Sequence, residues 1–163
     1  MTNTDQLPGP YTLSFLAREA AAQGPRAVRG LPEFLGGFVG EGRVEPATRV
    51  AFFLRMSKLL GCPVCRALFP KLAPMAGIDA AAAERAIHGE AAGLPAEAAA
   101  ALAWAEAVME AGGDEPAQVP TAAAALSDAQ RAHLLQAIRI ERVVHATGLL
   151  FLPRAMVERA ATH

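Results

Sequence analysis

The residues of this 163-residue chain with the clearest chemistry are Cys62 and Cys65, its only two cysteines, in the sequence Cys-Pro-Val-Cys. Proline suits the first position of a helix, so we expect a helix from Pro63, with Cys62 as its N-cap and Cys65 in its first turn. The free N–H groups and the positive dipole end at that location favour a thiolate. In a reducing cytoplasm such a pair indicates redox chemistry or metal binding rather than a structural disulfide.

The charge around the cysteines also favours a thiolate. Between residues 46 and 78 the chain has five cations and no acid. These cations are Arg49, Arg55, Lys58, Arg66 and Lys71. A positive field lowers the pKa of a thiol and makes its nucleophilic form more abundant at neutral pH. The alternative interpretation is that the cations form the solvated face of two helices.

Three interpretations of the pair remain open: a redox-active dithiol, an idle pair, and a zinc site. A closed zinc site needs four ligands. The other candidate ligands, His88, His133 and His145, are scattered without a second metal-like spacing. We therefore place the catalytic role on Cys62 and Cys65 and expect neither a metal nor an organic cofactor.

Composition predicts one all-α domain over residues 1–163. Alanine, the best helix former, is the commonest residue, whereas the chain has one Trp and one Tyr. The net charge of −1 gives no general case for nucleic-acid binding. No apolar run is long enough to cross a membrane, and the N-terminus lacks the pattern of a secretory signal, so we expect a cytoplasmic protein.

The hydrophobic pattern predicts about seven helices after a loose arm of residues 1–10. The expected elements are a helix over 11–23 ended by Gly24-Pro25, a Gly- and Pro-rich loop over 24–45, helices over 46–60, 63–75, 79–89 and 95–111, and a helix from 127 that Gly148 ends, with Pro153 opening a last one.

Several side chains have expected places in these helices. Val64, Leu68 and Leu72 recur at helical spacing and should face the core. Trp104 is expected to anchor one helix to another. Asp79 is expected to cap the helix that begins there, and Ser127 and Gln130 have the spacing of a capping box at the start of the long helix.

The sequence from Met56 to Cys65 resembles the AhpD-like alkylhydroperoxidase and carboxymuconolactone decarboxylase superfamily. In that group a helix ends in Asn-Gly or a similar pair, a Cys-x-x-Cys opens the next helix, and a short "Ala-x-x-x-Gly" phrase follows. Here Leu60-Gly61 precedes Cys62, and Ala73-Pro74-Met75-Ala76-Gly77 is similar to the phrase. The resemblance covers about residues 46–112 and implies an AhpD-like helical bundle.

The family's proton relay is not matched. Its motif resembles Glu-x11-Cys-x-[His/Tyr]-Cys-x3-His, and the three relay positions fall on Val50, Val64 and Phe69. Valine and phenylalanine cannot transfer protons. Which cysteine attacks is left open, because the N-cap position favours an exposed Cys62 whereas the resemblance favours Cys65.

The resemblance implies a thiol-dependent oxidoreductase that cycles a Cys62–Cys65 disulfide against a peroxide or a partner disulfide. Its expected partners are a small peroxide substrate, an electron-donor protein with thiols, and further copies of the chain in a homo-oligomer. The alternative is a degenerate member of the family that acts as an oligomeric binding or stress-related protein, an interpretation that the missing relay favours.

Overall fold

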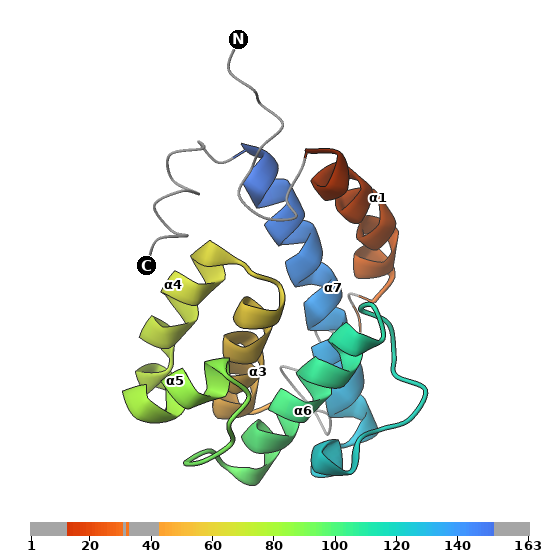
Figure 1. Cartoon of the computed structure of the whole chain (residues 1–163). Coiled ribbons are helices and arrows are strands. Elements are labelled where there is room, and N and C mark those ends of the chain that lie inside the picture. The colour runs from red at the N-terminus through yellow and green to blue at the C-terminus, as the bar shows by residue number, and fades with distance from the viewer. Residues whose placement is uncertain (1–12, 31, 33–42, 152–163) are drawn as a thin grey trace.

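The computed structural model describes residues 13–30, 32 and 43–151, and all regular structure within these ranges is helical (Figure 1). The α-helices are α1 (Leu13–Arg29), α3 (Pro46–Leu59), α4 (Pro63–Leu72), α5 (Ala80–Ile87), α6 (Ala96–Glu110) and α7 (Asp128–Phe151), and two 3-10 helices span Pro74–Ala76 and Thr121–Ala123. The expected all-α fold is confirmed. The predicted arm over 1–10 and the predicted helix from Pro153 lie outside the described residues.

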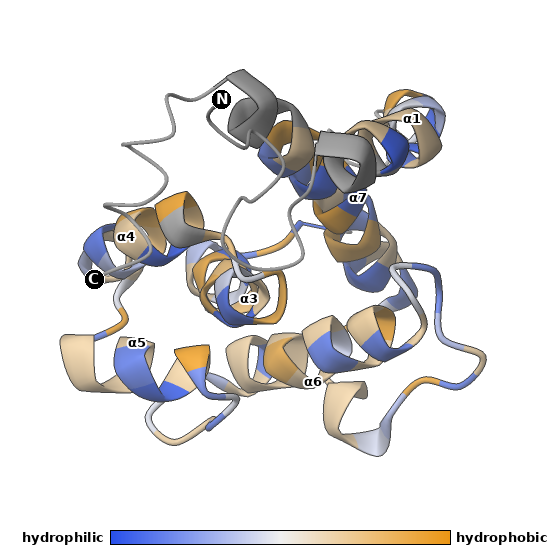
Figure 2. Cartoon of the chain, turned by 45° about the horizontal axis from the view of Figure 1, so that its top comes forward, coloured by the Kyte–Doolittle hydropathy of each residue, from blue (hydrophilic) through white to orange (hydrophobic). Residues whose placement is uncertain are grey.

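Helix α3 occupies the centre of the molecule. Figure 2 looks nearly along this helix and shows α4, α5, α6 and α7 arranged around it. On one side its Phe52 and Met56 are fully buried in a cluster that includes Trp104 of α6 and Ile138 of α7. A helix that is apolar on most faces is stable only when other elements cover those faces, which explains the central position of α3.

The other side of α3 packs against small side chains. Leu54 lies in a second cluster with Ile78, Ile87 and Leu102, and the remaining buried positions there are mostly alanines. These alanines are Ala51, Ala73, Ala82, Ala83, Ala86 and Ala98. Because a methyl group extends little from the backbone, the helices of this layer can approach one another closely.

Three local predictions for the helices after α4 are confirmed. Asp79 caps α5, since its carboxylate accepts from the Ala82 N–H at 2.8 Å. Ser127 and Gln130 form the capping box before α7, with reciprocal hydrogen bonds of 2.9 and 3.2 Å. Trp104 anchors α6 to α7, because its indole N–H donates to the Arg131 carbonyl at 3.2 Å.

The expectation that Gly24-Pro25 ends the first helix is wrong, because α1 continues to Arg29. A proline inside a helix removes one hydrogen bond, but α1 has compensating contacts with α7. Gln23 and Ala27 are buried, and the Gln136 side-chain amide of α7 donates to the Ala27 carbonyl at 2.8 Å. Packing between the two helices therefore outweighs the local cost of the proline.

The expectation that Gly148 ends the long helix is also wrong, because α7 continues through Gly148 to Phe151. Leu134, Leu135 and Ile138 of this helix are buried, whereas Val144 is 63% exposed and does not face the core. None of the described helices, α7 included, is long and apolar enough to cross a membrane.

The end of α3 has the hydrogen bonds of a Schellman motif. The N–H of Gly61 donates to the Lys58 carbonyl at 3.1 Å, and the N–H of Cys62 donates to the Ser57 carbonyl at 3.0 Å. Gly61 has φ of 61°, which glycine adopts without the steric cost that a β-carbon brings. This motif turns the chain from α3 into α4 and fixes the backbone of Cys62.

We expect Gly61→Ala to lower the free energy of unfolding by about 1–2 kcal/mol, because alanine must then adopt the left-handed conformation. Gly24→Ala is the matched control. Gly24 lies inside α1, and a β-carbon there would meet no atom within 4 Å. The control should raise stability by about 0.5–1 kcal/mol through helix propensity. Urea unfolding of both variants measures the difference, and equal effects of the same sign would contradict the motif.

Candidate functional site

Cys62 and Cys65 form a disulfide at the N-terminus of α4, with their Cα atoms 5.3 Å apart. Cys62 is the N-cap residue, as predicted, and its Sγ accepts a hydrogen bond from the Cys65 N–H at 3.2 Å. The Cys62 carbonyl accepts from the Arg66 N–H at 3.0 Å. The backbone and the sulfur of Cys62 are therefore held by both helices that meet at this residue.

The two cysteines differ in exposure, and the difference corrects the prediction made from the N-cap position. Cys62 is 2% exposed, whereas Cys65 is partly exposed. Cys62 is buried because the turn after α3 directs it toward the interior before α4 begins. An external nucleophile or oxidant can therefore approach Cys65, while Cys62 is shielded and lies beside a backbone N–H donor.

The buried face of α4 is not the predicted one. Val64 and Leu68 are 44% and 47% exposed, so they do not face the core. Phe69 and Ala73 face it instead and pack in the alanine-rich cluster beside α3. The inward face is therefore displaced by about one residue from the predicted one, which rested on the spacing of Val64, Leu68 and Leu72 alone.

Two of the three relay positions of the resembled motif pack against the same apolar cluster. Val50 of α3 and Phe69 of α4 both pack against the same apolar cluster. Phe53, one turn beyond Val50, stacks on Phe69 with the ring centroids 4.9 Å apart. The third position, Val64, is exposed at the start of α4. Val50 and Phe69 thus lie in apolar surroundings between α3 and α4.

Two of the five cations near the cysteines in the sequence have partners elsewhere in the fold. Arg49 donates to the Val44 carbonyl at 2.7 Å, and burial followed by the nearby Arg43 lowers its pKa, against the effect of Glu45. Arg55 pairs with Glu106 of α6 at 2.8 Å.

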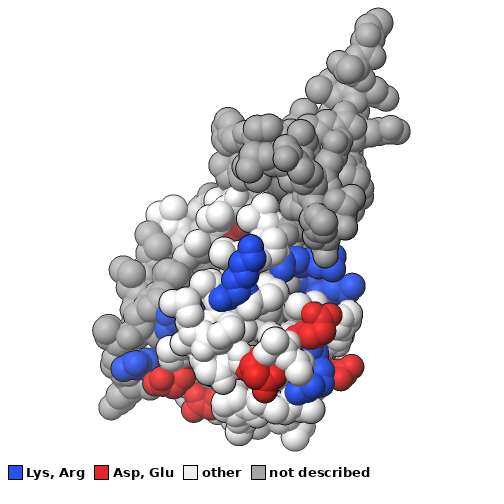
Figure 3. Space-filling view, turned by 90° about the vertical axis from the view of Figure 1, so that its left-hand side faces the viewer, with Lys and Arg blue, Asp and Glu red and all other residues white. Residues whose placement is uncertain are grey.

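The other three cations, Lys58, Arg66 and Lys71, are exposed. On the face in Figure 3, basic and acidic side chains are scattered over a broad uncharged surface, so the described part of this face has no continuous basic patch.

The histidines in the described part of the chain do not assemble with the cysteines into a metal site. His88 is exposed and lies 3.4 Å from Glu84 on its own helix. His133 is fully buried on α7, and His145 is partly buried two turns from the end of α7. Within the described ranges, no group of three or more His, Cys, Asp or Glu side chains could hold a metal ion.

Sequence reasoning missed Glu141. Glu141 follows Leu134 and Ile138 at helical spacing on the face of α7 that packs toward α3. Both carboxylate oxygens are buried, and neither has a hydrogen-bond partner among the described residues. Desolvation by this burial raises the pKa of Glu141 to about 8, so the side chain retains its proton at neutral pH. A glutamate at an apolar position of an otherwise amphipathic helix was the signal that could have identified it.

Comparison of the chain with protein-family models, with curated proteins and with solved structures gave no match in any of the three cases. Function is therefore inferred from the residues of this chain and their geometry.

The raised pKa of Glu141 gives stability a definite pH dependence. Between about pH 5 and pH 8 the unfolded chain loses a proton that the folded chain keeps, so the free energy of unfolding falls as pH rises. The slope from this group approaches about 1.4 kcal/mol per pH unit. Glu141→Gln should remove that slope and make the protein more stable than the parent at pH 8.

Urea unfolding at several pH values measures this effect, with Glu110→Gln, an exposed glutamate at the end of α6, as the control. A parent and a Glu141→Gln variant with parallel stability profiles would show that Glu141 is already ionised in the folded state.

Proposed function

We propose that this chain is a thiol-dependent oxidoreductase of the AhpD-like type, which cycles the Cys62–Cys65 disulfide against a peroxide or a partner disulfide. The observation that carries the proposal is the asymmetry of the pair. Cys65 is accessible, whereas Cys62 is buried with its sulfur on the Cys65 N–H.

Reduction of the disulfide uses this asymmetry directly. A thiolate of an electron-donor dithiol protein attacks the Cys65 sulfur, the Cys62–Cys65 bond breaks, and Cys62 leaves as a thiolate. The Cys65 N–H and the helix N-terminus stabilise that leaving group. The second donor thiol then resolves the mixed disulfide, so two electrons and two protons pass to this chain.

Oxidation runs through the same accessible sulfur. The Cys65 thiolate attacks a peroxide oxygen, the O–O bond breaks, and an alcohol or water leaves after protonation, with a sulfenic acid on Cys65. The Cys62 thiolate attacks that sulfur and displaces water, which restores the disulfide. Peroxide and the donor dithiol are together converted to the alcohol, water and the donor disulfide.

The second candidate is a catalytically degenerate member of the same family that acts as an oligomeric binding or stress-related protein. It is favoured by the apolar surroundings of two relay positions, where Val50 and Phe69 pack against the same cluster. Assembly into a homo-oligomer stays a prediction in both cases.

The reactivity of the two thiols tests the redox proposal. In Cys62→Ser, the remaining Cys65 should react with a disulfide reagent at least about tenfold faster than Cys62 reacts in Cys65→Ser, because only Cys65 is accessible. In the reduced parent, at least one thiol should titrate below about 8.5, the value for a free cysteine.

Stopped-flow absorbance measures the reaction rates, and mass spectrometry of the alkylated protein reports whether the parent re-forms its disulfide under mild oxidant. Equal rates in the two single variants, or a parent that never re-forms the bond, would reject the proposal.

The relay positions give a second test. Peroxide turnover of the parent should be slow, and the double variant Val50→Glu, Phe69→His should raise it by about 10²-fold or more, because a positioned acid or base contributes that much. Both changes place polar groups in an apolar cluster, so stability should fall by a few kcal/mol, on the order of 2–4.

Leu68→His is the matched control, because it adds a histidine to the exposed side of the same helix. A folded double variant without any gain over the control would mean that these positions do not serve proton transfer, which favours the degenerate protein.

A further inference from the structure

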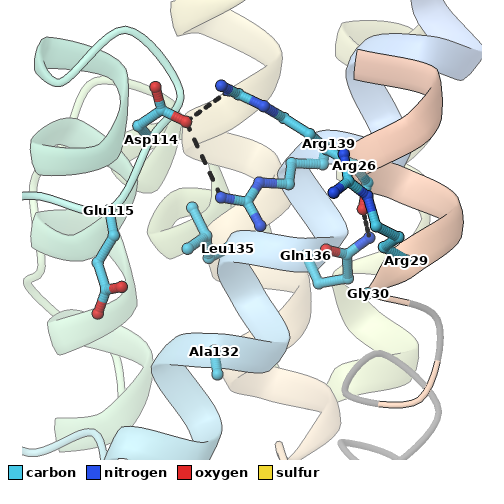
Figure 4. Close-up of a pocket in the computed structure, with 9 residues that line it drawn as sticks. All are labelled: Arg26, Arg29, Gly30, Asp114, Glu115, Ala132, Leu135, Gln136 and Arg139. Atoms are coloured by element: carbon cyan, nitrogen blue, oxygen red, sulfur yellow. Dashed lines mark hydrogen bonds and ion pairs between the residues drawn. The ribbon is translucent and has the colours of Figure 1, made fainter.

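A cleft lies away from the cysteines, between the end of α1, the segment after α6 and the middle of α7 (Figure 4). Its volume is about 660 Å³, within the usual range for sites of small molecules. Arg26 and Arg29 enter it from the last turn of α1, and Arg139 enters it from α7. Leu135 and Ala132 give it an apolar part.

The three guanidinium groups have more donors than the cleft has acceptors. Arg26 Nη1 donates to Asp114 Oδ1 at 2.6 Å, and Arg139 Nη2 lies 3.9 Å from the same oxygen, beyond hydrogen-bond distance. Arg29 Nε donates to the Pro25 carbonyl at 3.3 Å. Arg139 Nε is buried and has no hydrogen-bond partner among the described residues. A single carboxylate oxygen is thus shared by two of the three cations.

The lining of the cleft also has more positive than negative side chains, which favours binding of an anion. Glu115 is the second acid of the lining, but none of the three arginines lies within ion-pair distance of it, and Figure 4 shows its carboxylate on the side away from them. The remaining wall is neutral and fixed. Gln136 donates to the Ala27 carbonyl at 2.8 Å, and a β-carbon on Gly30 would come within 1.9 Å of Gln136 Oε1.

We propose that this cleft binds a phosphorylated small molecule, with its phosphate between Arg26, Arg29 and Arg139 and its organic part over Leu135 and Ala132. The arginines approach from two helices, and a tetrahedral phosphate presents oxygens in several directions, whereas a planar carboxylate matches one guanidinium fork. A phosphomonoester also carries a charge of about −1.5 to −2 at pH 7. Asp114 pairs with Arg26 and therefore competes with the ligand for this guanidinium.

Phenyl phosphate is the probe, and isothermal titration calorimetry at fixed ionic strength is the measurement. The parent should bind it saturably with a stoichiometry of one, and more tightly than it binds inorganic phosphate or benzoate. Arg29→Gln and Arg139→Gln should each weaken binding by about tenfold or more, because each removes charged hydrogen bonds. Arg43→Gln, which removes an exposed charge outside the cleft, should leave binding unchanged.

The variant Asp114→Asn distinguishes a ligand-binding cleft from an ion pair that only stabilises the fold. It removes the competitor of the ligand, so phenyl phosphate should bind more tightly, whereas loss of a structural contact would leave binding unchanged or weaken it. Arg29 is exposed and makes one hydrogen bond within its own helix, so Arg29→Gln should fold even if another variant does not.

Absence of saturable binding, benzoate binding as tight as that of phenyl phosphate, or Arg29→Gln equal to Arg43→Gln would overturn the proposal. The same titrations on Cys62→Ser, Cys65→Ser protein should give the parent's result, so the outcome does not depend on redox activity.

Discussion

The backbone of Cys62 belongs to two helices at once, and the geometry of the cysteine pair follows from that constraint. Its N–H closes the end of α3 on Ser57, and its carbonyl and sulfur accept the first N–H groups of α4. Gly61 makes this double role feasible, because only a residue that tolerates a positive φ can reverse the chain within so short a turn. One sulfur is thereby held inside and the other is left at the surface.

The same constraint explains which parts of the site could be predicted from the sequence. Gly61 before Cys62 and Pro63 after it were sufficient to predict the start of α4 and the N-cap position of Cys62. Both residues act through local backbone preferences. The exposure of Cys62 was not predictable in this way. It depends on the direction in which α3 delivers the chain, and that direction is set by the packing of α3 against α6 and α7.

The fold shows the same division between local and tertiary effects. The start of α7 and the cap of α5 were predicted correctly because each is a short-range hydrogen bond from a side chain. Pro25 and Gly148 were wrong boundaries because α1 and α7 cover each other, and the sequence around either residue carries no information about the partner helix. Glu141 was missed for a related reason, since its burial comes from neighbours far away in the chain.

The alanine-rich layer beside α3 has a mechanical consequence. An alanine methyl has no χ rotamers to change, so the alanine positions of this layer cannot absorb a shift of a neighbouring helix by rotating side chains. Ala73, which follows α4 directly, is fully buried in that layer. Ala82, Ala83 and Ala86 of α5 belong to the same layer. The position of α5 is therefore tied closely to that of the chain at the end of α4.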